Sequence, residues 1–117
     1  MAVITHTSSE IKRFGENALM VTWLQLSGAS SDTGSPFENP TWSDRSVQVV
    51  GTFGGSTVTM QGSNDGVNWI TLTDTAAGAA TFATTGLKQL LQVTRYIRPI
   101  ITGGTGLLDV HLLMVRK

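Results

Sequence analysis

The sequence predicts an all-β protein, a single antiparallel β-sandwich of about eight strands. Glycine accounts for 13 of the 117 residues, and turn-forming residues recur about every ten positions, a spacing typical of many short strands. Several segments alternate apolar and polar side chains with a period of two, as half-buried strands do. The chain length fits one domain, since independent domains usually span roughly 100–200 residues. We therefore expect residues 1–117 to form a single sandwich domain.

The chain begins with an arm, residues 1–9, followed by a strand at Leu19–Leu26. We expect the arm to be able to add a strand to the sheet edge of a neighbouring molecule. The strand carries apolar side chains on both faces, with Trp23 near its middle. Such a strand is either buried on both sides or covered on one face by another subunit. Trp23 is therefore a candidate partner contact.

A long loop, residues 27–45, interrupts the strand pattern, because it is too rich in glycine, serine and proline to be regular. Structureless connections longer than roughly 12–15 residues are uncommon in compact domains and usually have a function. The loop contains two large aromatic residues, Phe37 and Trp42. Large aromatic side chains seldom stay fully exposed, so we expect these two to pack either against the sandwich edge or against a partner.

Three glycine-containing turns predict three consecutive hairpins, which together would form an antiparallel meander. The turns are Gly54-Gly55, Asn64-Asp65-Gly66 and Gly103-Gly104-Thr105-Gly106. The segments that they separate are Val47–Phe53 from Thr57–Gly62, Thr57–Gly62 from Trp69–Leu72, and Tyr96–Thr102 from Asp109–Val115.

The segment between the second and third turns predicts shorter elements. Thr81–Ala83 predicts a short strand before Gly86. Gly86–Leu91 fits one helical turn, whereas Gln89–Thr94 fits a strand about as well, so both interpretations stay open here.

The motifs offer little for catalysis. The chain has no cysteine, which excludes disulfides and cysteine-type zinc sites. Neither His6 nor His111 has metal-ligand spacing to a carboxylate, and no Gly-x-Ser-x-Gly motif is present. The sequence therefore predicts a protein that is not an enzyme and that holds no metal or cofactor.

The charge balance limits the partners. Eight basic and eight acidic residues give a net charge of +0, and charged residues make up 14% of the chain, against a usual ~25%. Such a chain has no net field to attract phosphate backbones or acidic lipids, so we expect no nucleic acid and no membrane among its partners. A weakly charged surface favours self-association, and we expect a dimer.

A motif in the middle of the chain resembles the discoidin or galactose-binding-like jelly-roll family. That family repeatedly shows Ser-x-Asp-Gly-x-x-Trp between two strands and, nearer its end, Arg-Tyr-(Ile/Val)-Arg. Here the two patterns are Ser63-Asn64-Asp65-Gly66-Val67-Asn68-Trp69 and Arg95-Tyr96-Ile97-Arg98. The resemblance implies a sandwich of jelly-roll type with a structural motif formed by Ser63, Asp65, Gly66, Trp69, Arg95, Tyr96 and Arg98.

Residues 46–117 as a whole are similar to small virion proteins of tailed bacteriophages, notably capsid decoration or cement proteins. This resemblance implies a structural protein of the capsid surface, made in the cytoplasm of the bacterial host, whose partner is the major capsid protein. Phe37, Trp42 and Trp23 would supply the contacts. Two alternatives stay open: a carbohydrate-binding or receptor-binding module that stacks sugars on Trp42 or Trp69, and a tail or baseplate component.

Overall fold

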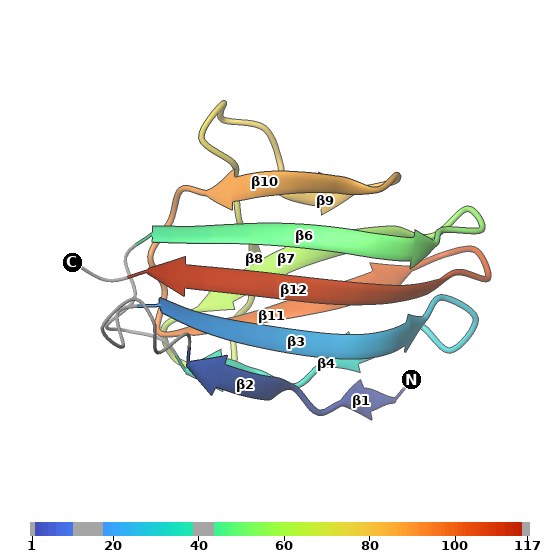
Figure 1. Ribbon diagram of the computed structural model, residues 1–117, viewed down its shortest axis with the longest axis horizontal. Helices are drawn as coiled ribbons and strands as arrows, with labels where there is room; N and C mark the ends of the chain where they lie inside the picture. Colours follow the sequence, from blue (N-terminus) through green and yellow to red (C-terminus); the bar gives the residue numbers. More distant parts are fainter. Residues whose placement is uncertain (1, 11–17, 39–43, 116–117) are drawn as a thin grey trace.

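The computed structural model describes residues 2–10, 18–38 and 44–115, and it shows two β-sheets packed face to face (Figure 1). This part of the chain contains no helix that could cross a membrane. Its twelve strands are β1 (Val3–Ile4), β2 (Thr7–Glu10), β3 (Ala18–Ser27), β4 (Thr33–Gly34), β5 (Phe37–Glu38), β6 (Asp44–Thr52), β7 (Thr57–Ser63), β8 (Ile70–Thr71), β9 (Thr81–Phe82), β10 (Gly86–Leu90), β11 (Tyr96–Thr102) and β12 (Leu107–Val115).

The predicted fold class is confirmed, since the described chain is an all-β sandwich of jelly-roll type with nearly all strand pairs antiparallel. One sheet has the order β10-β6-β12-β3-β2. The other has the order β1-β4-β11-β7-β8, with β5 paired to β11 and β9 paired to β7. The strand count exceeds the expected eight because five strands are only two residues long. The pair β1–β4 is parallel.

Alternating apolar side chains of the long strands form the core between the sheets. In β12, for example, Leu108, Val110, Leu112 and Met114 are fully buried, and the residues between them face outward. Each such side chain stabilises the fold by about 1.5–3 kcal/mol relative to its exposed state. These side chains belong to one core cluster that includes residues of both sheets.

Only one of the three predicted hairpins is present. Gln61 and Gly62 of β7 pair with Thr71 and Ile70 of β8 around the Asp65 turn, which confirms the second hairpin. The other two turns join strands of opposite sheets, since β6 pairs with β10 and β12 while β7 pairs with β11. The predicted meander is wrong for this reason: the strands on either side of these turns face each other across the core and do not share a ladder.

A β-bulge in β3 explains why Leu26 faces the core although Leu24, two residues earlier, faces outward. Trp23 is paired with Val110 and Leu26 with Leu108, so two residues of β3, Leu24 and Gln25, lie opposite one residue of β12. Gln25 has a positive φ of 60°. Trp23 and Leu26 are three residues apart, yet both are fully buried. The bulge therefore shifts the alternation by one position. The inward and outward series therefore exchange positions within one strand.

The N-terminal arm adds strands to its own molecule. β1 pairs with β4 of one sheet, and β2 pairs with β3 of the other, so the arm passes along one side of the sandwich from sheet to sheet. A contact of this arm with a neighbouring molecule stays a prediction. The first part of the long loop, expected to be irregular, contributes β4 and β5, both of which pair with β11.

The ambiguous segment after the second turn is a strand. Thr81–Phe82 forms β9, in line with the expected short strand, and Gly86–Leu90 forms β10, which pairs along its whole length with β6. The alternative of a helical turn at Gly86–Leu91 is wrong, because Leu90 faces the core while Leu87 and Gln89 face outward.

Three turns meet at one end of the sandwich around Ser56. The Ser56 hydroxyl donates to the carbonyl oxygen of Gly103 at 2.7 Å and accepts from the amide of Gly106 at 2.9 Å. Gly106 in turn accepts a hydrogen bond from the amide of Gly28. The side chain of Ser56 is buried, so one hydroxyl joins the turn after β3, the turn after β6 and the turn after β11.

Candidate interaction surfaces

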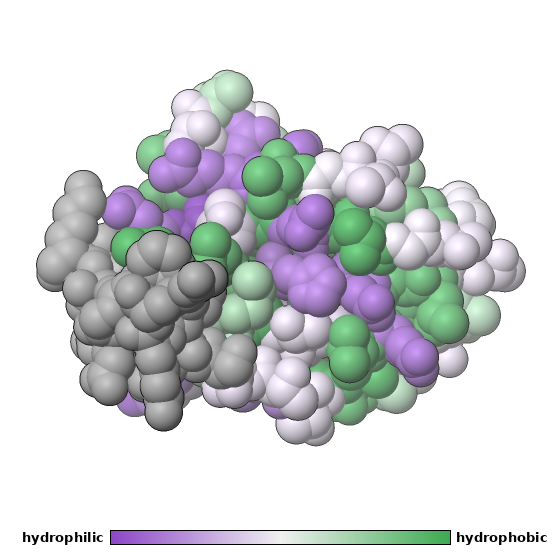
Figure 2. All heavy atoms as spheres, in the orientation of Figure 1, coloured by the Kyte–Doolittle hydropathy of each residue, from purple (hydrophilic) through white to green (hydrophobic). Residues whose placement is uncertain are grey.

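The outer face of the five-stranded sheet carries exposed apolar side chains between polar ones, and Figure 2 shows these two kinds interleaved. Leu24 of β3 is 51% exposed, Leu87 of β10 is 67% exposed and Leu107 of β12 is 49% exposed. Strand register places Gln48, His111 and Thr22 side by side across the middle of the face. Exposed leucines on three strands of one sheet, set among polar side chains, make this face a candidate interface, because non-obligate interfaces mix apolar and polar surface in this way.

A shallow depression of about 320 Å³ lies at one end of this face, between β10, β6 and β12. Its lining residues include Leu87, Leu113 and Val115, with Asp44 and Arg45 at the edge. Arg45 is buried, and the loss of hydration lowers the pKa of its guanidinium. The Arg45 Nη2 atom donates to the Gln92 carbonyl oxygen, which satisfies part of that buried cation. With Ser46 and Gln89 also in its lining, the depression combines apolar and polar side chains.

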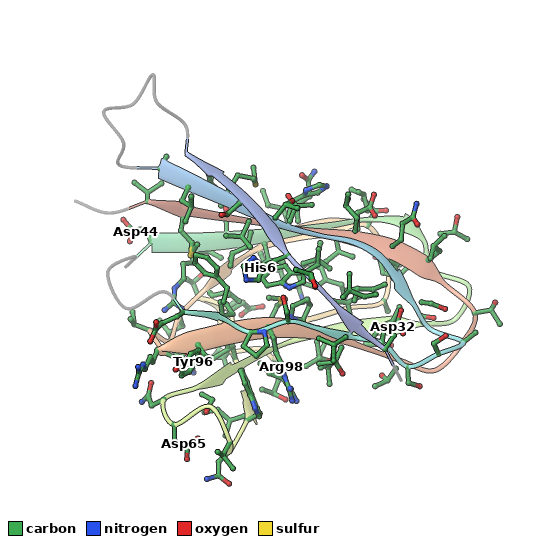
Figure 3. All side chains as sticks on the ribbon, turned by 90° about the horizontal axis from the view of Figure 1, so that it is seen from below. His6, Asp32, Asp44, Asp65, Tyr96 and Arg98 are labelled. Atoms are coloured by element: carbon green, nitrogen blue, oxygen red, sulfur yellow. The ribbon has the colours of Figure 1, made fainter. Side chains whose placement is uncertain are left out.

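The opposite face of the molecule, on the seven-stranded sheet, carries a second cluster. The Arg98 guanidinium of β11 lies over the ring of Trp69, 4.1 Å from its centroid. The Arg98 Nε atom donates to Gln61 Oε1 of β7 at 3.0 Å. Figure 3 shows Arg98, Tyr96 and Asp65 on the side of this sheet that faces away from the five-stranded sheet. Arg98 thus spans β7 to reach a ring that precedes β8.

The turn at Asp65 precedes Trp69 and is held together by hydrogen bonds to the Asp65 carboxylate. The carboxylate of Asp65 accepts hydrogen bonds from the Asn68 and Val67 amides, each at 2.8 Å, and from the hydroxyl of Ser63 and the side-chain amide of Asn68. These donors, the Asn68 amide first, hold the pKa of Asp65 well below its usual range. Gly66 has a positive φ of 77° and lies against the Tyr96 ring. The motif is therefore built as a rigid turn.

Arg95, the remaining motif residue, forms an ion pair on the same side of the sheet. Its Nε atom donates to Glu38 Oε2 at 2.6 Å. The hydrogen bond to Glu38 raises the pKa of Arg95. Both side chains are about half exposed, and exposed pairs of this kind contribute little to stability.

The residues predicted to contact a partner have different environments. Trp23 has no exposed surface, and its Nε1 atom donates to the Ser35 carbonyl oxygen at 2.9 Å. Trp23 continues the inward alternation of Leu19 and Val21, so its ring lies in the core of its own chain, and a contact with a partner stays a prediction. Phe37 is half-buried, packs against the core and meets His6 edge-on at 5.1 Å between ring centroids. Its partner contact stays a prediction, and Trp42 lies outside the described residues.

Residues that sequence reasoning missed are Leu87 and Gln61. Leu87 was assigned to an ambiguous segment, although its place two residues before Gln89 puts both on one face of a strand. Gln61 gave no signal, because its role depends on a neighbour 37 positions away in sequence. Among the described residues, no group of three or more His, Cys, Asp or Glu side chains could hold a metal ion.

Comparisons with known proteins establish a fold but no family. No family model matches the chain, and no curated protein matches it. Among solved structures, the SPBc2 prophage-derived protein YomS is 11% identical with a TM-score of 0.64, and the match covers 84% of this chain and 94% of YomS. The PBSX exported protein XepA is 16% identical with a TM-score of 0.66 over 84% of this chain. This chain spans only 38% of the length of XepA.

Proposed function

We propose that this chain is a non-enzymatic structural protein of a bacteriophage particle, and specifically a capsid decoration or cement protein that binds the lattice of the major capsid protein. The observation that carries the proposal is the outer face of the five-stranded sheet, on which Leu24, Leu87 and Leu107 are exposed among polar side chains. The shared fold with a prophage-derived protein supports the phage setting. A cement protein needs only surface to bury, and this face supplies it.

The face approaches the size of a standard interface. Its five strands have four to ten residues each, and at about 3.4 Å per residue and about 4.8 Å between strands they cover a projected area of about 600 Å². A standard interface buries roughly 800 Å² on each partner. Repetition over a capsid lattice multiplies contacts of this size, so each one can be modest and the shell still gains stability.

The proposal is tested with capsids of the encoding phage that lack the protein. Purified protein is added back, and bound protein is measured by co-sedimentation. We expect saturable binding and a higher melting temperature of the decorated capsid. Leu24→Lys and Leu87→Lys, each of which places a charge on this face, should each weaken binding about tenfold or more, because a buried unpaired charge is costly.

A matched control introduces the same lysine at a position outside the five-stranded sheet. Val67→Lys adds the same charge at a side chain that is 77% exposed in the Asp65 turn, away from the five-stranded sheet. We expect Val67→Lys to bind capsids as the unmodified protein does. Equal losses in all three variants, or binding to tails in place of capsids, would contradict the proposal.

A further inference from the structure

Arg98 is held in place but offers unused donors. The Trp69 ring supports the flat side of its guanidinium at 4.1 Å, and Gln61 fixes the Nε atom at 3.0 Å. Within the described ranges, the two terminal nitrogens of Arg98 donate no hydrogen bond, and neither is a buried atom without a partner. A guanidinium immobilised in this way loses little rotamer entropy on binding and presents a planar fork of donors.

The charges nearby leave Arg98 as the cation available to a ligand. Arg95, three residues earlier, is paired with Glu38. The Asp65 carboxylate is occupied by four donors of its own turn. Arg98 has no carboxylate within 4.0 Å in the part of the chain that the structure describes. One fixed guanidinium matches one carboxylate through two parallel hydrogen bonds.

Three residues with hydroxyl groups share the outer face of the seven-stranded sheet with Arg98. Strand register places Thr71 directly across β7–β8 from Gln61, and Thr59 and Tyr96 two residues away along their strands. Side chains at such positions share a face with Arg98. The hydroxyls of Thr71, Thr59 and Tyr96 make no side-chain hydrogen bond among residues 2–10, 18–38 and 44–115. The patch therefore combines one cation with several free hydroxyls on a rigid sheet.

The geometry points to a binding site for a carboxylate-bearing sugar of the uronic acid class, centred on Arg98 and independent of the capsid contact proposed above. Arg98 would hold the carboxylate with its terminal nitrogens. Thr71, Thr59 and Tyr96 would exchange hydrogen bonds with the ring hydroxyls. A doubly charged phosphate would call for more than one cation, and an acidic side chain of a protein would leave these hydroxyls unused.

The experiment titrates D-glucuronate into the isotopically labelled full chain and follows the NMR signal of the Trp69 indole N–H, assigned with Trp69→Phe. We expect saturable shifts with a dissociation constant on the order of 1 mM. D-glucose, which has the hydroxyls without the carboxylate, and acetate, which has the carboxylate alone, should each bind about tenfold more weakly.

Two variants locate the site. Arg98→Lys keeps the charge but loses the fork and the stacking, so glucuronate should bind about tenfold more weakly. Arg95→Lys makes the same change at the arginine three residues away and should leave binding unchanged. The NMR spectrum of each variant also reports whether it is folded.

Three results would overturn the inference. They are the absence of shifts at the highest glucuronate concentration, equal binding of acetate and glucuronate, and an equal loss of binding in the two arginine variants. Because the site lies on the opposite face from Leu24 and Leu87, the capsid-binding variants Leu24→Lys and Leu87→Lys should bind glucuronate normally. Failure of either proposal is thus distinguishable from failure of the other.

Discussion

Asp65 shows how one side chain can determine the shape of a whole turn. Its carboxylate takes the place of a backbone acceptor for the Val67 and Asn68 amides and also holds Ser63. Asparagine in its place would keep one acceptor oxygen, but its amide nitrogen could not accept a hydrogen bond. The aspartate in the motif is therefore required by its charge and its acceptors, whereas the spacing of the sequence predicted the turn but not this role of the carboxylate.

Asp65 should make the stability of the protein depend on pH. Because the folded protein lowers the pKa of Asp65, the carboxylate stabilises the fold fully above its unfolded pKa of about 3.9, and this contribution is lost as the pH falls below that value. Asp65→Asn cannot be protonated and lacks the contribution at every pH. We expect the melting temperature of the unmodified protein to exceed that of Asp65→Asn by a few °C above about pH 5.

The gap between the two melting temperatures should begin to narrow below about pH 4 and shrink further as the pH falls toward the lowered pKa of Asp65. Thermal unfolding followed by circular dichroism from about pH 7 to about pH 2 measures it. A gap that stays constant down to the lowest pH would show that the charge of Asp65 does not stabilise the turn.

Whether an aromatic ring is buried or exposed was hard to predict for individual residues. Phe37 and Trp23 were both singled out as aromatic residues in unusual surroundings, yet Trp23 is fully buried. The sequence contains the relevant signal, since Leu19, Val21 and Trp23 keep one alternation and Leu26 breaks it. A bulge and a strand that is apolar on both faces produce the same pattern, and only the pairing with β12 separates them.

At the scale of elements, the strands were predictable and their pairing was not. Alternation in β6, β7, β11 and β12 is a local property, and the predicted boundaries fall within a few residues of the observed ones. Gly54, Gly55, Gly103 and Gly104 all have positive φ values, as a tight turn requires. Positive φ is equally suited to a turn that passes from sheet to sheet, so the same signal fits both topologies.

Ser56 should be important for the stability of the end where these turns meet. Ser56→Ala removes a buried hydroxyl that donates to Gly103 and accepts from Gly106, and it leaves the Gly106 amide without that acceptor. We expect a loss of about 1–3 kcal/mol in the free energy of unfolding, measured by urea titration.

Ser30→Ala provides the control for this prediction. Ser30 is an exposed serine in the turn after β3, at the same end of the molecule. Its replacement should change the free energy of unfolding by less than about 0.5 kcal/mol. Similar effects of the two substitutions would mean that the hydroxyl of Ser56 does not hold the three turns together.

At the scale of the whole molecule, the proposed interface face also bears on the expected dimer. Two copies could bury their five-stranded sheets against each other around a two-fold axis, since the same face would then meet itself. We expect the mass measured by sedimentation equilibrium to rise above 12.5 kDa as concentration increases. Leu113→Lys, on the outer side of β12, should return it to 12.5 kDa.

A mass of 12.5 kDa at every concentration would show that this face does not bind itself. Val67→Lys is the matched control for Leu113→Lys, and it should associate as the unmodified chain does.

The fold class and the motif turn could be predicted from composition and spacing, whereas this face depends on which strands are neighbours. Leu24, Leu87 and Leu107 are far apart in sequence and meet only through β6 and β12.

The place of β12 has a consequence for how the protein is made. It lies between β3 and β6 in the five-stranded sheet and is the last strand in chain order. During translation, β3 and β6 leave the ribosome first and have no common neighbour until β12 follows. The nascent chain therefore completes this sheet only after β12 has left the ribosome, and until then the unpaired edges of β3 and β6 are open to aggregation.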